Sequence, residues 1–183
     1  MFQSWNQVLI NSQVAGSGPT NTTTETSLLP AAAKFTIPAN FFQIGSVLRI
    51  TLCSQVSNVA TTPGTLNLKV KFGSTAVFTG GAQQLSTTVH TTLPHWWDVL
   101  LTCQVIGSSA VFMGQGRSMG QMCLRSGADL ATDGVEMTPN STPAQGTAFD
   151  STATQVVDLT ATMSTTTSGT SMAGQQYVLE SLN

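Results

Sequence analysis

The chain has little charge for its length of 183 residues. Only 8% of the residues are Asp, Glu, Lys or Arg, against roughly 25% in ordinary soluble proteins. Six residues are basic and the formal net charge is −2. A nucleic-acid interface needs a dense cationic stripe, an anionic membrane attracts a basic cluster, and a spanning helix needs an apolar run of roughly 18 residues. The sequence has none of these, so we expect neither nucleic acid nor a membrane as a partner.

Reactive side chains are also scarce. The three cysteines, Cys53, Cys103 and Cys123, form no CxxC pair, which argues against a zinc site or a disulfide framework. We expect them to be buried, reduced thiols. Only His90 and His95 could serve a catalytic triad, and no GxSxG elbow is present. His95 precedes two tryptophans and is expected to pack at a strand start, so the sequence predicts no enzyme, no catalytic residue and no cofactor.

Acidic residues number eight, and a glycosidase would need two of them paired across a cleft. Their only local concentration is Asp129, Asp133 and Glu136. This spacing lacks the alternating oxygen ligands of an EF-hand loop. These three residues could form either a solvated loop surface or a cation site, and both alternatives are kept. We assign no metal site to them.

Threonine and serine fill the place of the missing charge, with 29 Thr and 19 Ser beside an apolar content of 40%. Disordered chains are poor in apolar residues and rich in net charge, which excludes that class. Thr is stiff at its first side-chain torsion and suits the half-buried surface of a pleated sheet. The composition therefore indicates β structure, with 16 Gly and 7 Pro to form the turns.

Apolar residues alternate with polar ones in several segments, a pattern typical of strands with one buried face. The clearest segments are residues 48–52, 66–72, 97–105 and 157–163. The Gly73-Ser74 step between two such runs predicts a tight hairpin, and residues 38–43 could form one helical turn. Gly114 and Gly116 lie in a strand-like run, where glycines mark a bulge or a close backbone approach.

One-sided alternation over about eight to ten short strands predicts an all-β fold, an antiparallel β-sandwich that is jelly-roll-like. No linker divides the chain, so residues 1–183 are expected to form a single domain. Residues 1–26 are polar and Gly- and Thr-rich, a candidate extended arm. Residues 126–152 are rich in Asp, Gly, Pro, Ser and Thr and are expected to form a long loop with little regular structure.

Adjacent aromatic residues on a strand must point to opposite faces of its sheet. One of Trp96 and Trp97 should therefore lie in the core, and the other at the rim or against a partner, because Trp is a favoured interface anchor. Phe41 and Phe42 pose the same choice. The residues predicted to contact other subunits or a capsid are Trp5, Phe41, Trp96, Asp129 and Asp133.

Four short motifs follow one another in the order TTTETSL, IPANFF, GSVLRI and LNLKVKFGS, at residues 22–28, 37–42, 45–50 and 66–74. In this order they resemble a group of tailed-bacteriophage virion structural proteins, of the capsid decoration (cement) or head-fibre type. The likeness covers residues 20–120 and the last two strands, and departs from the group in the Cys and Met content of residues 113–124. It implies a jelly-roll module that trimerises on a capsid surface or in a fibre, and it carries over no catalytic residue.

The resemblance and the low charge favour a capsid decoration protein that stabilises the shell as a homotrimer bound to the major capsid protein. The alternative is a tail-fibre, tail-spike or head-fibre domain that binds a host receptor or glycan. A lectin-like site should show an exposed aromatic residue beside Asp or Asn, and Trp96 or Trp97 beside Asp98 is the only local match. A polysaccharide hydrolase is the third hypothesis, and it would need converging carboxylates.

Overall fold

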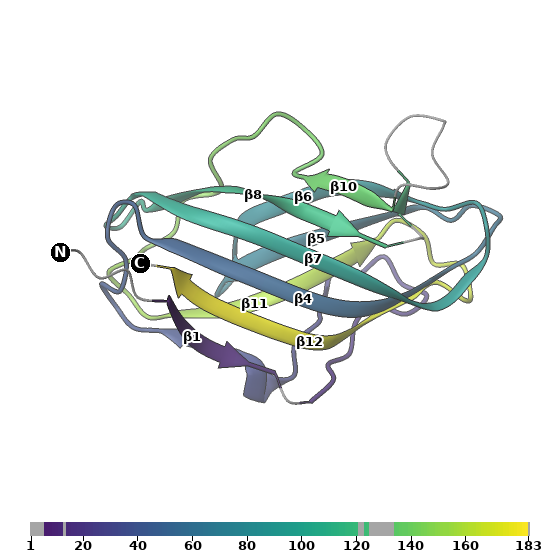
Figure 1. Cartoon of the computed structure of the whole chain (residues 1–183), viewed down its shortest axis with the longest axis horizontal. Helices are drawn as coiled ribbons and strands as arrows, with labels where there is room; N and C mark the ends of the chain where they lie inside the picture. The colour runs from purple at the N-terminus through teal and green to yellow at the C-terminus, as the bar shows by residue number, and fades with distance from the viewer. Residues whose placement is uncertain (1–5, 13, 121–122, 125–133, 183) are drawn as a thin grey trace.

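The computed structural model describes residues 6–12, 14–120, 123–124 and 134–182 (Figure 1). Its elements are β1 (Asn6–Asn11), β2 (Thr26–Ser27), the 3₁₀ helix η1 (Ala31–Ala33), β3 (Thr36–Ile37), β4 (Val47–Asn58), β5 (Thr65–Phe72), β6 (Thr75–Leu85), β7 (His90–Val105), β8 (Val111–Met119), β9 (Cys123–Leu124), β10 (Val135–Thr138), β11 (Gln155–Met163) and β12 (Ser171–Leu182). No helix in these residues is long and apolar enough to cross a membrane.

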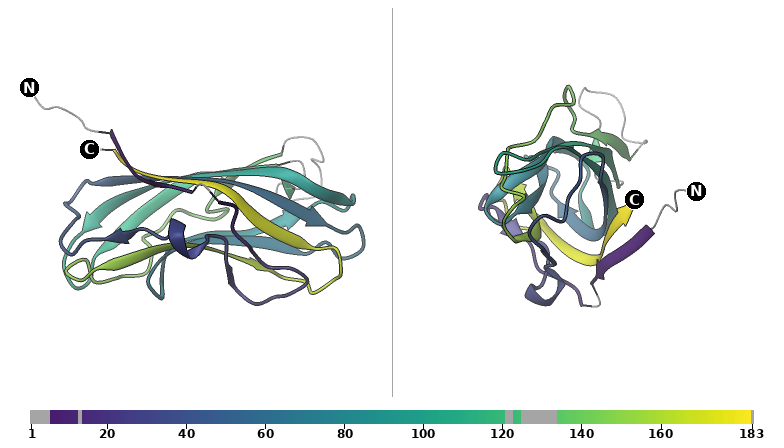
Figure 2. Two further views of the ribbon diagram at one scale, coloured as in Figure 1. Left: turned by 90° about the horizontal axis from the view of Figure 1, so that it is seen from below. Right: turned by 90° about the vertical axis from the view of Figure 1, so that its left-hand side faces the viewer.

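The strands form two antiparallel sheets packed face to face (Figure 2), which confirms the predicted β-sandwich. One sheet, called the front sheet here, has the strand order β1-β12-β4-β7-β8-β10. The other, the back sheet, has the order β2-β11-β5-β6-β9, with β3 also paired to β11. The hairpins β5–β6 and β7–β8 each stay within one sheet, whereas the connection from β11 to β12 crosses between the sheets.

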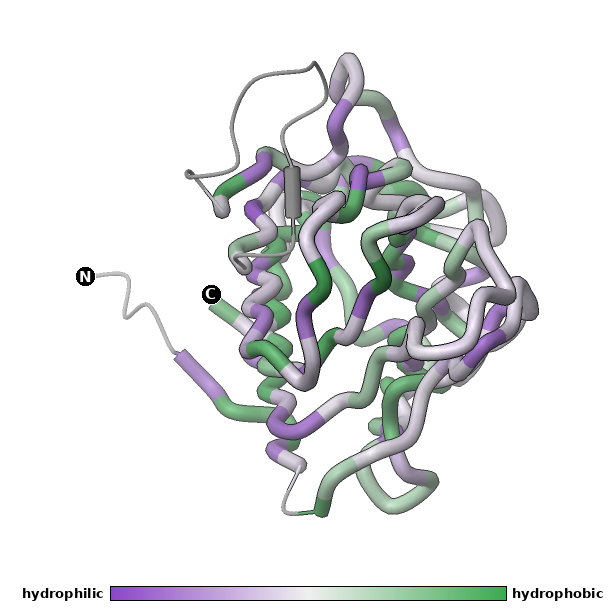
Figure 3. Tube along the Cα trace, turned by 90° about the vertical axis from the view of Figure 1, so that its right-hand side faces the viewer, coloured by the Kyte–Doolittle hydropathy of each residue, from purple (hydrophilic) through white to green (hydrophobic). Residues whose placement is uncertain are grey.

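The four clearest alternating segments of the sequence all form strands, β4, β5, β7 and β11. In β5 every second residue is buried, from Leu66 to Phe72, and the residues between them are only partly buried. Hydrophobic and hydrophilic residues accordingly alternate along the strands in the end view (Figure 3). Burial of each large apolar side chain contributes roughly 1.5–3 kcal/mol, so the inward rows of the two sheets hold the sandwich together.

Four phenylalanine rings fill one part of the core between the sheets. They are Phe42, Phe72, Phe112 and Phe149, each at most 5% exposed. Their centroids lie 5.0 to 6.0 Å apart, in edge-on and stacked pairs. These are the favourable geometries for aromatic pairs. The cluster joins strands of both sheets to the loops before β4 and β11.

The Gly73-Ser74 hairpin forms as predicted between β5 and β6, and Gly73 has a φ of +57°, in the region that glycine adopts without strain. The predicted helical turn at residues 38–43 is wrong. Asn40 lies there with a φ of +57°, a left-handed conformation that a right-handed helix cannot continue through. Its backbone N–H instead donates to the Ser151 carbonyl at 2.8 Å.

The described part of the predicted N-terminal arm lies along the edge of the front sheet. β1 pairs with the last residues of β12, from Asn6 opposite Leu182 to Asn11 opposite Val178. Beyond it, the backbone N–H of Gly16 donates to Gly174. The chain then crosses to the back sheet, where β2 pairs with β11.

Residues 134–152 belong to the predicted long loop. They contain β10, which pairs with β8 through Glu136 opposite Ser118. After β10 the chain continues alongside β8 in the same direction as β10. Phe149 forms an antiparallel β-bridge with Ala110, just before the start of β8. This stretch closes the side of the sandwich between β8 and β6.

Candidate functional site

Trp96 and Trp97 point to opposite faces of β7, as the sequence predicts. Trp97 is fully buried and its ring lies 6.0 Å from that of Phe78 in the back sheet. Trp96 is 40% exposed on the outer face of the front sheet. A half-exposed indole on a sheet supported by a rigid core is a preorganised platform for a ligand.

The register of the front sheet surrounds Trp96 with side chains from four other strands. Antiparallel partners lie side by side on the same face, about 4.5–5.5 Å apart at Cβ. One row across the sheet is Gln176, Cys53, Trp96, Met119 and Val135. The next row is Val178, Thr51, Asp98, Arg117 and Met137.

Asp98 is the charged centre of this face. Arg49 donates to it through Nε, 3.1 Å from Oδ1, and through a terminal nitrogen, 3.3 Å from Oδ2. The hydroxyl of Thr51 donates to Oδ1 at 3.2 Å, and Arg117 approaches Oδ2 at 4.0 Å. The hydrogen bond to Asp98 is the main cause that raises the pKa of Arg49. These hydrogen bonds hold the carboxylate of Asp98 in a fixed position, two residues from the exposed indole of Trp96.

Glycine at position 116 lets β8 come close to β7 beside this cluster. A Cβ on Gly116 would lie 2.0 Å from the carbonyl oxygen of Asp98, which is closer than real Cβ atoms come. A Cβ on Gly114 would meet the ring of Phe78 at 2.2 Å. The predicted close backbone approach is confirmed at Gly116, whereas Gly114 makes room for the side chain of Phe78. The close approach at Gly116 brings Arg117 opposite Asp98 in the register.

A shallow groove of about 230 Å³ runs from Trp96 across β4 and β12 to the end of β1. Its lining residues are Asn11, Ser12, Thr51, Cys53, Trp96, Gln176, Tyr177 and Val178. Two amides, Asn11 and Gln176, and two hydroxyls, Ser12 and Thr51, therefore lie along a groove with the indole at one end. Amides and hydroxyls each both donate and accept hydrogen bonds, which matches a ligand that carries hydroxyl groups.

Of the other predicted contact residues, only Phe41 is among the described residues, and it does not lie on this face. Phe41 is half-buried and packs edge-on against Phe42, 5.2 Å away, beside the aromatic core. Trp5, Asp129 and Asp133 lie outside the described residues. The contact role of these four residues stays a prediction.

Glu136 does not lie on a solvated loop surface, which corrects that interpretation for this residue. It lies in β10, is 6% exposed, and burial raises the pKa of its carboxyl group. Its neighbour across the ladder, Ser118, is also buried. In the described part of the chain, no three His, Cys, Asp or Glu side chains come together in a way that could hold a metal ion.

His95 is buried within β7, as its place before the tryptophans predicts, although it lies well inside the strand. Its Nδ1 is 2.9 Å from the Ser54 hydroxyl and its Nε2 is 2.6 Å from that of Ser118. Burial lowers the pKa of His95 to about 4 and raises the pKa of both described thiols, Cys53 and Cys103. At neutral pH these groups are uncharged, and the histidine links strands β4 and β8.

Sequence reasoning found Trp96 and Asp98 but missed the rest of the site. Arg49, Thr51, Arg117 and Gln176 are far from them in the chain and are brought alongside only by strand pairing. The available signal was that each of them occupies an outward position of an alternating segment. That signal selects many polar residues and does not say which of them are neighbours.

No family model matches the chain, and no curated protein matches it. Among solved structures, the chain is similar to the CBM2 module of Lactobacillus casei BL23 phage J-1 evolved Dit. The TM-score is 0.43 and the sequence identity is 11%, over 100% of this chain and 98% of that chain. A TM-score of this size carries no inference about function, which has to come from the geometry of the front sheet.

Proposed function

We propose that this chain is a non-enzymatic glycan-binding module of a phage virion, of the tail-fibre, tail-spike or head-fibre kind. One observation carries the proposal. Trp96 is exposed at the end of a groove lined by amides and hydroxyls, with the fixed carboxylate of Asp98 on the same face. The assignment to a virion is supported by the resemblance of the motifs between residues 22 and 74 to phage structural proteins.

The chemistry of the groove fits a sugar chain. One face of a pyranose ring carries C–H groups that pack on an indole, and its edges carry hydroxyl groups. Gln176 and Asn11 can each donate to one hydroxyl and accept from another, and Asp98 accepts only. The groove runs across strands β4 and β12, so a sugar packed on Trp96 could also contact polar side chains of both strands.

Binding at such an open site should be weak for a single module. A shallow groove leaves much of the ligand in water, and we expect a Kd on the order of 0.1–1 mM, or about −5 kcal/mol. A virion carries many copies of its structural proteins. Simultaneous engagement of several modules on one cell surface would raise the overall avidity by orders of magnitude.

The test is a printed array of bacterial cell-surface oligosaccharides probed with the fluorescently labelled full chain. We expect binding to a restricted set of glycans, at least tenfold weaker in Trp96→Ala. The matched control is Leu100→Ala, because Leu100 is 45% exposed on the same strand and face but outside the groove. A chain that binds no glycan on the array, or a Trp96→Ala variant that binds as well as Leu100→Ala, would overturn the proposal.

A specific observation also favours the capsid decoration function. Six exposed large hydrophobic residues lie on strands of the front sheet: Val8, Trp96, Leu100, Val105, Val135 and Met137. Exposed apolar residues gathered on one face mark a protein contact in many structures. The predicted homotrimer and its contact with the major capsid protein would use this face, so sedimentation of the isolated chain tests this second candidate.

A further inference from the structure

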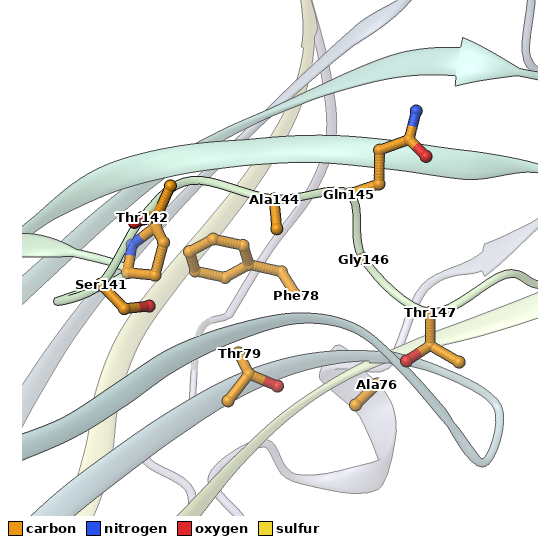
Figure 4. Close-up of a pocket in the computed structure, with 10 residues that line it drawn as sticks. Ala76, Phe78, Thr79, Ser141, Thr142, Ala144, Gln145, Gly146 and Thr147 are labelled. Carbon is orange, nitrogen blue, oxygen red and sulfur yellow. The ribbon is translucent and has the colours of Figure 1, made fainter.

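A second pocket lies at the side of the sandwich, away from the groove at Trp96. Over residues 75–80, β6 forms an edge of the back sheet, because its described partner β9 pairs only with Gln84 and Leu85. Residues 139–147 pass beside this edge (Figure 4). Together they line a shallow pocket of about 220 Å³.

The segment beside the edge is held at its two ends. Asn140 donates from its backbone N–H to Gly80 at 3.1 Å and from its side chain to Ala82 at 2.6 Å. At the other end, the N–H of Gly146 donates to the Phe112 carbonyl at 2.8 Å. A Cβ on Gly146 would lie 1.8 Å from the Val77 carbonyl oxygen, so only glycine fits at this anchor. The residues between these two anchors stand away from β6, and the space between them and the strand is the pocket.

The pocket has an aromatic ring at its base. Figure 4 shows Phe78 between the segment that carries Ala144 and the strand that carries Thr79 and Ala76. Phe78 is fixed from behind by Trp97, whose ring lies 6.0 Å away. The ring is therefore a rigid apolar surface against which a ligand can pack.

Hydroxyl groups supply most of the polar lining. They belong to Thr79, Ser141, Thr142 and Thr147, and among the described residues none of these side chains has a hydrogen-bond partner. The hydroxyl of neighbouring Thr138, by contrast, donates to the Gly80 carbonyl at 3.1 Å. Four unpaired hydroxyls around one pocket can donate to and accept from a ligand that itself carries hydroxyls.

No lining residue is charged. An ionic ligand would lose its hydration without gaining a counter-charge, which disfavours carboxylated, phosphorylated or amino ligands. The volume is also below the roughly 300–1,000 Å³ of sites for drug-sized molecules. The pocket therefore fits one small, neutral, polyhydroxylated ring.

We propose that this pocket is a second binding site, which takes a single neutral sugar residue. The inference rests on the proposed glycan-binding function for its biological meaning, but its lining shares no residue with the Trp96 groove. Two sites on one module would let it engage two branches, or two chains, of a surface polysaccharide. Each would raise the effective concentration of glycan at the other.

The experiment titrates the ¹⁵N-labelled full chain with methyl glycosides of glucose, galactose, mannose, rhamnose and N-acetylglucosamine, into the millimolar range. We expect at least one of them to give saturable shifts of the backbone amides of Ala144, Gly146 and Thr147. The doubly substituted variant Thr79→Val, Thr142→Val keeps the shape of the side chains and removes two hydroxyls. It should bind at least tenfold more weakly, because each hydrogen bond to the ligand is lost without a substitute.

Two controls separate this pocket from the groove and from general effects of threonine removal. Thr154→Val removes an exposed hydroxyl outside the pocket and should leave the titration unchanged. Trp96→Ala should also leave it unchanged, even where that variant has lost binding on the glycan array. The absence of saturable shifts with all five sugars, or shifts insensitive to the double substitution or lost in Trp96→Ala, would overturn the second site. None of these outcomes contradicts glycan binding at Trp96.

Discussion

The outer faces of the two sheets differ in how their charges are used. On the back sheet, Lys69 and Lys71 both bind Glu25, with Nζ to carboxylate oxygen distances of 2.5 and 2.7 Å, and Lys34 binds Asp158 at 2.7 Å. Glu25 and Lys34 come from the N-terminal segment that flanks β2. The side chains in these pairs are at most 29% exposed.

On the front sheet, no covering segment takes up the polar groups in the described part of the chain. Arg49 and Arg117 are 42% and 53% exposed at their side chains, although both approach Asp98. Six of the exposed large hydrophobic residues lie on strands of this sheet, against one, Val156, on the back sheet. The two outer faces therefore differ. The back sheet holds the N-terminal segment through ion pairs, and the front sheet keeps charged and hydrophobic side chains exposed.

The largest expected effect on the free energy of unfolding tests whether side chains on the outer face of the front sheet contribute to stability. Trp97→Ala should lower the free energy of unfolding by about 3–5 kcal/mol, because it leaves a cavity beside Phe78 in the core. Trp96→Ala, one residue earlier in the same strand, should lower it by less than about 1 kcal/mol. Urea unfolding followed by circular dichroism measures both. A loss at Trp96 comparable to that at Trp97 would show that the outer indole is part of the fold.

The fold was largely predictable because burial on one face imposes a period of two on the sequence. Residues 48–52, 66–72, 97–105 and 157–163 all lie in strands, and one of the two adjacent tryptophans, Trp97, lies in the core as predicted for one of the pair. Val105 departs from the pattern: it is 43% exposed because a bulge interrupts the pairing between Cys103 and Val105. A bulge adds one residue to one strand, and alternation alone does not locate it.

The site was less predictable because it depends on which strands are neighbours. Asp98 and Trp96 are close in sequence and were identified together. Arg49 and Arg117 reach Asp98 from β4 and β8, and that requires the register of both pairings. The second pocket depends on how residues 139–147 stand away from β6, and the sequence of that segment, with two prolines and two threonines, does not specify this.

The next largest effect on stability comes from His95, a titratable side chain buried in the front sheet. Burial lowers the pKa of His95 to about 4, whereas an unfolded histidine titrates near 6.5. The unfolded chain therefore takes up the proton first, so stability is fully present above about pH 6.5 and falls as the pH drops towards 4. We expect a loss of about 2 kcal/mol between pH 7 and pH 5, measured by urea unfolding.

His90→Gln leaves His95 as the single histidine, so its titration can be followed without overlap by NMR. This measurement also separates His95 from Glu136, whose raised pKa acts in the opposite direction. A titration midpoint near 6.5 in the folded protein would contradict the buried, neutral state.

A smaller effect on stability is expected from Glu25, which lies on the outer face of the back sheet. Hydrogen bonds from Lys69 and Lys71 lower the pKa of Glu25 to about 2. Its contribution is present above about pH 4.5 and is lost as the pH falls towards 2. Glu25→Gln should cost about 1–2 kcal/mol at pH 7, less than the full shift implies because the pairs are partly screened by solvent.

The difference between Glu25→Gln and the wild type should shrink steadily below pH 4.5. Glu180→Gln on the front sheet is the matched control, because Glu180 forms no ion pair within the described residues, and it should change stability by less than about 0.5 kcal/mol. If both substitutions lowered the free energy of unfolding equally, the proposed difference in charge pairing between the two outer faces would be wrong.

The smallest expected effect on stability bears most directly on what the front sheet contacts. Val135 and Met137 are 47% and 66% exposed on β10, and the double substitution Val135→Ser, Met137→Ser should change the unfolding free energy by about 0.5 kcal/mol or less. If this face binds glycans, the variant should keep the sedimentation mass of the wild type, because no subunit contact is lost. A wild type that sediments as a trimer and a variant that sediments as a monomer would instead assign the face to self-association. The exposed hydrophobic residues would then mark a subunit interface, as the decoration function requires, and Trp96 would lie within it.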